Sequence, residues 1–196
     1  MLRTKQLIIV GGPSCSGKTF LLRKIRQTDL PELRKQIGLH EPSSWCYVNG
    51  RKLSGVRQSD IDRLVVHYDF LSCHSHENGF QDLHALISNT GHATVLTLCA
   101  RPETLHQRIT SRLAGIFISL IGNPKTYRKK NRHLHSLWTK RKFYTEKTGV
   151  HNLYREWFNF FDERGITNQW VIQSDKAELE SAMPYNRDVA NSWIGI

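Results

Sequence analysis

A run of eight residues near the amino terminus has the composition needed to bind a polyphosphate. It comprises Gly12, Pro13, Ser14, Cys15, Ser16, Gly17, Lys18 and Thr19, and it fits the pattern G-x-x-x-x-G-K-[ST]. The glycines permit close approach of the main chain, and successive N–H groups at the start of a helix can surround a β-phosphate. Lys18 adds a mobile positive charge, and the Thr19 hydroxyl can bind Mg²⁺. We therefore expect these residues to bind ATP with Mg²⁺, all but Pro13 contacting the nucleotide.

A carboxylate is expected beside that loop. The apolar run 64–68 is followed directly by Asp69, which would stand at the carboxyl edge of a sheet, where open α/β sheets bind their ligands. There Asp69 can hold a magnesium-bound water or take a proton from an acceptor hydroxyl. We expect Asp69 to be catalytic and, with Thr19, to bind the metal.

Basic residues follow the fourth strand-like run. Arg108 and Arg112 lie four residues apart, and so share one flank of a helix expected over Glu103–Leu113. Arginines placed there can neutralise charge on a phosphoryl group in transfer. The segment of about 114–142 contains the helix breakers Gly122, Asn123 and Pro124, and we expect it to form a mobile, basic cover like a lid.

The elements that must position these residues alternate along the chain. Five short apolar runs are expected to be strands, and between them lie stretches with helical periodicity. The strands are Leu7–Val10, Trp45–Val48, Leu64–Tyr68, Thr94–Cys99 and Trp170–Ile172, and further helices are Lys18–Gln27 and the aromatic Val150–Arg164, with Gly165 as its stop. This alternation predicts one α/β domain over 1–196, three layers deep, with a five-stranded parallel sheet between helices.

Charge and cysteine content narrow the class of protein. The net charge is +11, and the stretch between Glu103 and Glu146 has ten basic residues and no acidic one. Such a cationic region attracts phosphates of nucleotides, metabolites or nucleic acid. Four widely separated cysteines without a CxxC pair favour a reducing compartment. No apolar run approaches the ~20 residues of a membrane span, so we expect a cytoplasmic location without membrane partners.

These residues resemble the small P-loop kinases of the nucleotide-kinase-like group. The resemblance is carried by Gly12–Thr19, the strand ending in Asp69, and the fourth strand followed by Arg101, Arg108 and Arg112. It implies a P-loop NTPase fold with strand order 2-3-1-4-5, an acceptor-binding insertion between strands 1 and 3, and an arginine-bearing lid after strand 4. By similarity, Arg51 and Arg57 would bind the acceptor, and Arg128 would act from the lid.

The leading hypothesis is an ATP- and Mg²⁺-dependent phosphotransferase that acts on a small-molecule acceptor. Catalysis would rest on positioning and charge neutralisation by Lys18, Arg108 and Arg112, with Asp69 assisting. A nucleotide-dependent NTPase that binds nucleic acid through Lys125–Lys142 is a less favoured alternative. A third is a sulfotransferase-like P-loop protein, which the sequence 67–69 and the pair Tyr154 and Trp157 resemble. The chemical identity of the acceptor stays open.

Overall fold

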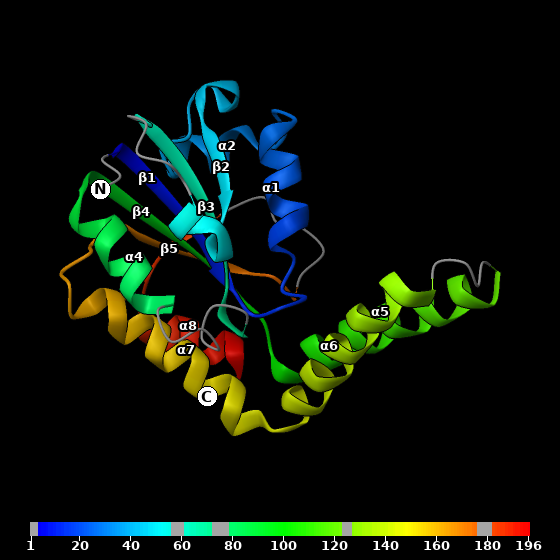
Figure 1. Ribbon diagram of the computed structural model, residues 1–196. Coiled ribbons are helices and arrows are strands. Elements are labelled where there is room, and N and C mark those ends of the chain that lie inside the picture. Colours follow the sequence, from blue (N-terminus) through cyan, green and yellow to red (C-terminus); the bar gives the residue numbers. More distant parts are fainter. Residues whose placement is uncertain (1–3, 56–60, 72–78, 123–126, 176–181) are drawn as a thin grey trace.

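A computed structural model describes residues 4–55, 61–71, 79–122, 127–175 and 182–196. They form a six-stranded sheet of order β2-β3-β1-β4-β5-β6 with helices on both faces (Figure 1). The strands are β1 (Thr4–Gly12), β2 (Cys46–Asn49), β3 (Arg63–Asp69), β4 (Thr90–Cys99), β5 (Gln169–Gln173) and β6 (Met183–Pro184). The helices are α1 (Lys18–Arg26), α2 (Pro31–Gln36), α4 (Gly79–Ser88), α5 (Pro102–Gly122), α6 (Tyr127–Thr145), α7 (Lys147–Asp162) and α8 (Arg187–Ile194), with 3-10 turns η1 (Pro42–Ser44) and η2 (Gly50–Gly55).

The central strands contain buried apolar stretches, such as Leu7–Val10 of β1, because both faces of the sheet are covered. Successive side chains of a strand point to opposite faces, and in β1 this separates Leu7 and Ile9 from Ile8 and Val10. The first pair packs in a cluster with residues of α4, α5, α7 and α8. The second pair packs with residues of α1 and α2. The structure is thus a three-layer α/β/α arrangement, as the sequence predicts.

The predicted strand order is found, but the sheet is larger than predicted. β2, β3, β1, β4 and β5 are neighbours in that order and parallel throughout. The sixth strand, β6, pairs antiparallel with β5, so the prediction of a purely parallel five-stranded sheet is wrong. Two residues, one of them Pro184, carry no alternating pattern by which a strand can be recognised.

α7 supplies most of the aromatic core. Tyr154, Trp157, Phe158 and Phe161 are almost fully buried, and the Trp157 ring lies 4.6 Å from that of Phe70. Buried polar atoms on these rings need partners. The Tyr154 hydroxyl accordingly donates to Leu98 O and accepts from Ala100 N, both at 2.9 Å. The helix ends close to its predicted stop, and Gly165 has the left-handed φ of 65°.

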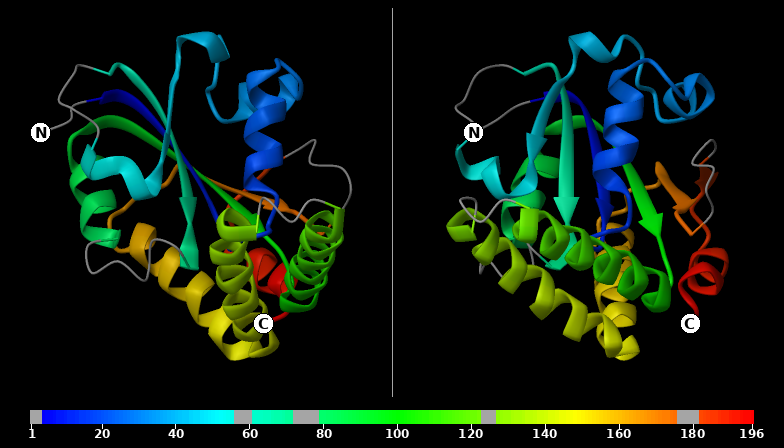
Figure 2. Two further views of the ribbon diagram at one scale, coloured as in Figure 1. Left: turned by 45° about the vertical axis from the view of Figure 1, so that its right-hand side comes forward. Right: turned by 90° about the vertical axis from the view of Figure 1, so that its right-hand side faces the viewer.

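The basic segment after β4 is helical, where a mobile cover is predicted. α5 and α6 lie side by side as an antiparallel hairpin beyond the carboxyl ends of the strands (Figure 2). α5 continues through Gly115 to Gly122, past the predicted end at Leu113. A single glycine costs a helix only about 1 kcal/mol, and Ile116 still packs against the core cluster. None of the helices in the described ranges is long and apolar enough to cross a membrane.

Contact between Gly11 and Trp157 yields a test of this packing. A Cβ on Gly11 would lie 2.2 Å from Cζ2 of Trp157, so we expect Gly11→Ala to lower the free energy of unfolding by about 1–3 kcal/mol. Gly115→Ala is the control, because it meets no atom within 4 Å and should stabilise α5 by about 0.5–1 kcal/mol. Both are measured by urea unfolding; wild-type stability of Gly11→Ala would contradict the packing.

Candidate functional site

The candidate site lies where parallel strands β1 and β3 end. The register pairs Gly12 with Asp69, and α1 begins six residues after Gly12, at Lys18. The loop between them, together with the first residues of α1, is called loop 12–19 below. Strand pairing therefore brings a carboxylate beside this loop from 57 residues away in the sequence.

Loop 12–19 turns sharply, and its glycines lie at the positions where the main chain has a positive φ. Gly12 and Gly17 have φ of 154° and 100°, a region that disfavours residues with a Cβ. A Cβ on Gly12 would lie 2.7 Å from Oγ of the buried Ser16. Cys15 also has a left-handed φ, 68°. The loop is therefore compact, and most of its residues are buried or half-buried.

The amino terminus of α1 opens from this loop without a capping side chain. Its N-cap residue is Gly17, whereas the Asn186 side chain caps α8 by accepting from Asp188 N and Val189 N. The first N–H groups of a helix carry partial positive charge and lack partners within the helix. α1 thus presents the local geometry of an anion site, whereas the side chain of Asn186 occupies the same position in α8.

Lys18 is the buried cation at the centre of the loop. Its side chain is 4% exposed, and its Nζ donates to Gly12 O at 2.7 Å, to Pro13 O at 2.6 Å and to Asp69 Oδ2 at 3.3 Å. Burial lowers the pKa of Lys18, and the charge of Asp69 acts in the opposite direction. The ammonium group is therefore held by three oxygen atoms that also fix the shape of the loop.

Asp69 joins the loop to α6. Its Oδ2 accepts from Ser14 Oγ at 2.7 Å, and its Oδ1 lies 3.8 Å from Lys140 Nζ. Lys140 also donates to Ser14 Oγ. Four residues further along α6, the buried Tyr144 hydroxyl donates to Ser14 O at 2.8 Å, and burial raises the pKa of Tyr144 well above its usual value.

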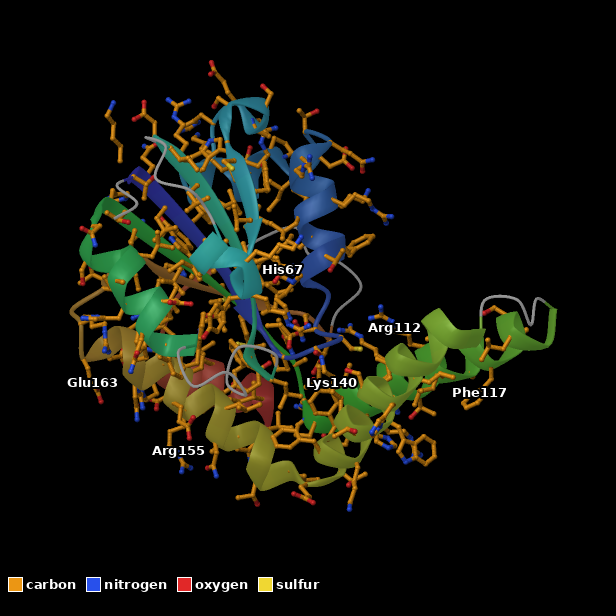
Figure 3. The ribbon with its side chains drawn as sticks, viewed as in Figure 1. His67, Arg112, Phe117, Lys140, Arg155 and Glu163 are labelled. Carbon is orange, nitrogen blue, oxygen red and sulfur yellow. The ribbon has the colours of Figure 1, made fainter. Side chains whose placement is uncertain are left out.

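A cavity of about 430 Å³ opens over the loop and Asp69; it is called the loop cavity below. Figure 3 shows Arg112 and Lys140 where the hairpin meets the loop, with Phe117 farther out. Besides Asp69, the charged side chains that line the cavity within the described residues are cationic, and they come from α1, η2, α5 and α6. They are Lys18, Arg51, Arg108, Arg112 and Lys140. Clustered cations around a helix amino terminus favour a multiply charged anion.

The structure brings together the residues that the sequence analysis selects and that lie within the described ranges. The cavity is lined by five residues of the loop: Ser14, Cys15, Gly17, Lys18 and Thr19. Gly12 and Ser16 do not line it but pack closely against each other within the loop. Arg108 lies in the cavity wall, where its guanidinium donates to Ser174 O and, at 3.4 Å, to Cys15 O. Arg112 and Arg51 are exposed and line the cavity. Arg57 lies outside the described residues, as does the side chain of Arg128.

Sequence reasoning missed His67, Lys140 and Tyr144 as site residues. All three carry a periodic signal. His67 is two residues before Asp69, so both side chains share one face of β3. On α6, Lys140 and Tyr144 follow the buried Leu137 at i+3 and i+7, so these residues share one face of the helix. Because the region contains ten basic residues, the sequence does not distinguish Lys140 from the others.

Oxygen donors for a metal ion are few at this site. Asp69 and Thr19 both line the loop cavity, and no group of three or more His, Cys, Asp or Glu side chains within the described ranges could hold a metal alone. This donor set suits Mg²⁺, which is usually bound through one or two carboxylates with waters and substrate phosphates. It does not suit zinc, which needs three or four nitrogen or sulfur ligands.

Comparisons with known proteins identify no relative: no family model, curated protein or solved structure matches the chain.

Burial of His67 predicts a specific acid sensitivity. Burial first, and then the charge of Lys18, lower the pKa of His67 from 6.5 to about 4. Between these values the unfolded chain binds more protons, so the free energy of unfolding should fall as the pH drops from 6.5 to 4. We expect His67→Gln to show a smaller loss of stability across this range in urea unfolding. His135→Gln, at an exposed position, is the control; equal acid sensitivity of wild type and His67→Gln would contradict the assignment.

Proposed function

We propose that the chain is a P-loop kinase: an ATP- and Mg²⁺-dependent phosphotransferase acting on a small-molecule acceptor. One observation carries the proposal. Loop 12–19 turns compactly at the carboxyl end of β1, opens into the uncapped start of α1, and lies in hydrogen-bond contact with Asp69. Its motif, its position at the edge of a parallel sheet and its cationic surroundings all suit a nucleoside triphosphate.

The chain's own residues would bind and orient the polyphosphate. The first amides of α1 would bind the β-phosphate, and Lys18 would exchange a loop carbonyl for a phosphate oxygen, because its stem is flexible. Thr19 and Asp69 would hold Mg²⁺, which supplies charge neutralisation between the β- and γ-phosphates when bound. Arg112 and Lys140, from the hairpin, line the same cavity and would balance charge on a transferring group.

Inward-facing hairpin residues favour phosphotransfer over nucleic-acid binding. Lys140 contacts Ser14 and Asp69, and Arg141 donates to Thr110 Oγ1 at 3.0 Å. These two cations therefore serve contacts within the fold. Nucleic-acid binding by this segment would show a steep loss of affinity with salt, and sulfotransfer would require affinity for a 3′-phosphorylated adenylyl sulfate.

Substitution of Lys18 tests nucleotide binding. We expect Lys18→Ala to weaken MgATP binding by about 10- to 100-fold, because a charge-assisted hydrogen bond contributes about 1.5–3 kcal/mol. Titration calorimetry measures the affinity, and Lys24→Ala, which removes a half-buried lysine of the same helix that pairs with Asp29, should bind as wild type does.

The proposal would fail if the wild-type protein bound no MgATP at millimolar concentration. It would also fail if ATP hydrolysis without acceptor were the only activity in a phosphate-transfer screen over nucleosides, sugars and small alcohols. Tight binding of 3′-phosphorylated adenylyl sulfate in place of MgATP would support sulfotransfer instead, and salt-sensitive binding of DNA or RNA would support the nucleic-acid alternative.

Substitution of Lys140 tests the role of the hairpin. We expect Lys140→Met to lower kcat with the best acceptor of that screen by about 100-fold, with a smaller change in MgATP affinity. Lys142→Met is the matched control, since Lys142 is exposed on the same helix. A kcat for Lys140→Met equal to that of wild type would exclude Lys140 from the transfer step.

A further inference from the structure

A second cavity adjoins the loop cavity. It also has a volume of about 430 Å³ and lies between α1 and strands β2 and β3; we call it the α1 groove. Thr19, Asn49 and His67 line both cavities, so the two spaces share a wall. Figure 3 places His67 beside α1 at this junction. Each volume lies in the usual range for a small-molecule site.

Part of the lining of the α1 groove is apolar. Leu22 of α1 and Val65 of β3 line it, and the Tyr47 ring from β2 lies beside them. Register explains this, since Tyr47 pairs with Val65 and Asn49 with His67, and paired residues point to the same face of the sheet. Half-buried aromatic and aliphatic side chains of this kind favour a flat apolar ligand.

The rim of the α1 groove is cationic. Arg23 and Arg26 line it from α1, and none of its lining residues that the structure describes is acidic. The Arg26 guanidinium carbon lies 4.8 Å from the Tyr47 ring centroid, so a planar cation already stands over a planar ring. A guanidinium group held in this way can bind a carboxylate or phosphate through two parallel hydrogen bonds.

We propose that the α1 groove is the acceptor site, and that the acceptor is a hydroxyl-bearing compound with a flat apolar body and an anionic group. Tyr47 and Leu22 contact the body, and Arg26 binds the anion. The hydroxyl end lies at the shared wall, facing the loop cavity. This inference rests on the proposed phosphotransferase function, but the groove and its lining do not depend on nucleotide.

In this arrangement the γ-phosphoryl group of ATP is transferred to the acceptor hydroxyl. The acceptor oxygen forms a bond to the γ-phosphorus, and the bond from that phosphorus to the β,γ-bridging oxygen breaks. Its electron pair leaves with ADP, and the hydroxyl proton passes to water in the open groove. The products are the phosphorylated acceptor and ADP.

Three matched probes test the ligand class by saturation-transfer NMR without nucleotide. They are 4-hydroxyphenylacetate, which has both a flat body and a carboxylate, the neutral 4-hydroxyphenylethanol, and acetate, which lacks the ring. We expect 4-hydroxyphenylacetate to bind most tightly and, in a separate NMR spectrum of the protein, to shift the ring-proton resonances of His67. Equal binding of all three probes, or no binding of 4-hydroxyphenylacetate, would overturn the proposed ligand class.

Two substitutions test the location. Arg26→Gln should weaken binding of 4-hydroxyphenylacetate about tenfold, and Leu22→Trp should abolish it by filling the groove. Arg155→Gln is the control, because Arg155 is exposed on α7, away from the groove (Figure 3). Circular dichroism and MgATP affinity, both expected to match wild type, show that each variant is folded.

The experiments distinguish failure of the acceptor-site proposal from failure of the kinase proposal. If wild type and both variants bind MgATP, but neither substitution changes binding of 4-hydroxyphenylacetate, the α1 groove is not the acceptor site and the kinase proposal stands. If wild type binds no MgATP, the kinase proposal fails, whatever the groove binds.

Discussion

The site depends on the hydrogen bonds and the ion pair that the buried ammonium group of Lys18 makes. A charge removed from water needs close acceptors, and here they are Gly12 O, Pro13 O and the Asp69 carboxylate. These acceptors meet only because β1 and β3 are parallel and in a register that pairs Gly12 with Asp69. The shape of the loop and the ion pair between Lys18 and Asp69 therefore both depend on the register of β1 and β3.

The helical hairpin of α5 and α6 contacts the same loop. Lys140 and Tyr144 of α6 both contact Ser14, at its hydroxyl and its carbonyl oxygen respectively. α6 leads directly into α7, whose aromatic residues form much of the core. The base of the hairpin is thus anchored on both sides, and any displacement of α6 would alter the contacts that Ser14 makes with Asp69. On the proposed function, nucleotide binding and hairpin position would be coupled through this one serine.

Prediction from sequence succeeded where one local pattern was sufficient. The first, third and fourth strands are recognisable as near-continuous apolar runs, because strands covered on both faces are rich in apolar residues on both sides. Asp69 could be placed at the sheet edge from the end of its strand. By contrast, β6 and the full length of α5 were missed. A two-residue strand has no period, and the pairing that makes it a strand lies in β5, while the continuation of α5 past Gly115 is supported by packing against the core and α6.

Sequence alone determined the composition of loop 12–19, the alternation of strands and helices, and the cationic stretch after β4, since each is a property of neighbouring residues. Tertiary structure decided which lysine of α6 faces the loop: Lys140 lines the cavity, whereas Lys142, two residues further on, does not. It also decided that His67 stands between two cavities. Contacts of this kind join residues far apart in the chain, and only strand register and helix packing bring them together.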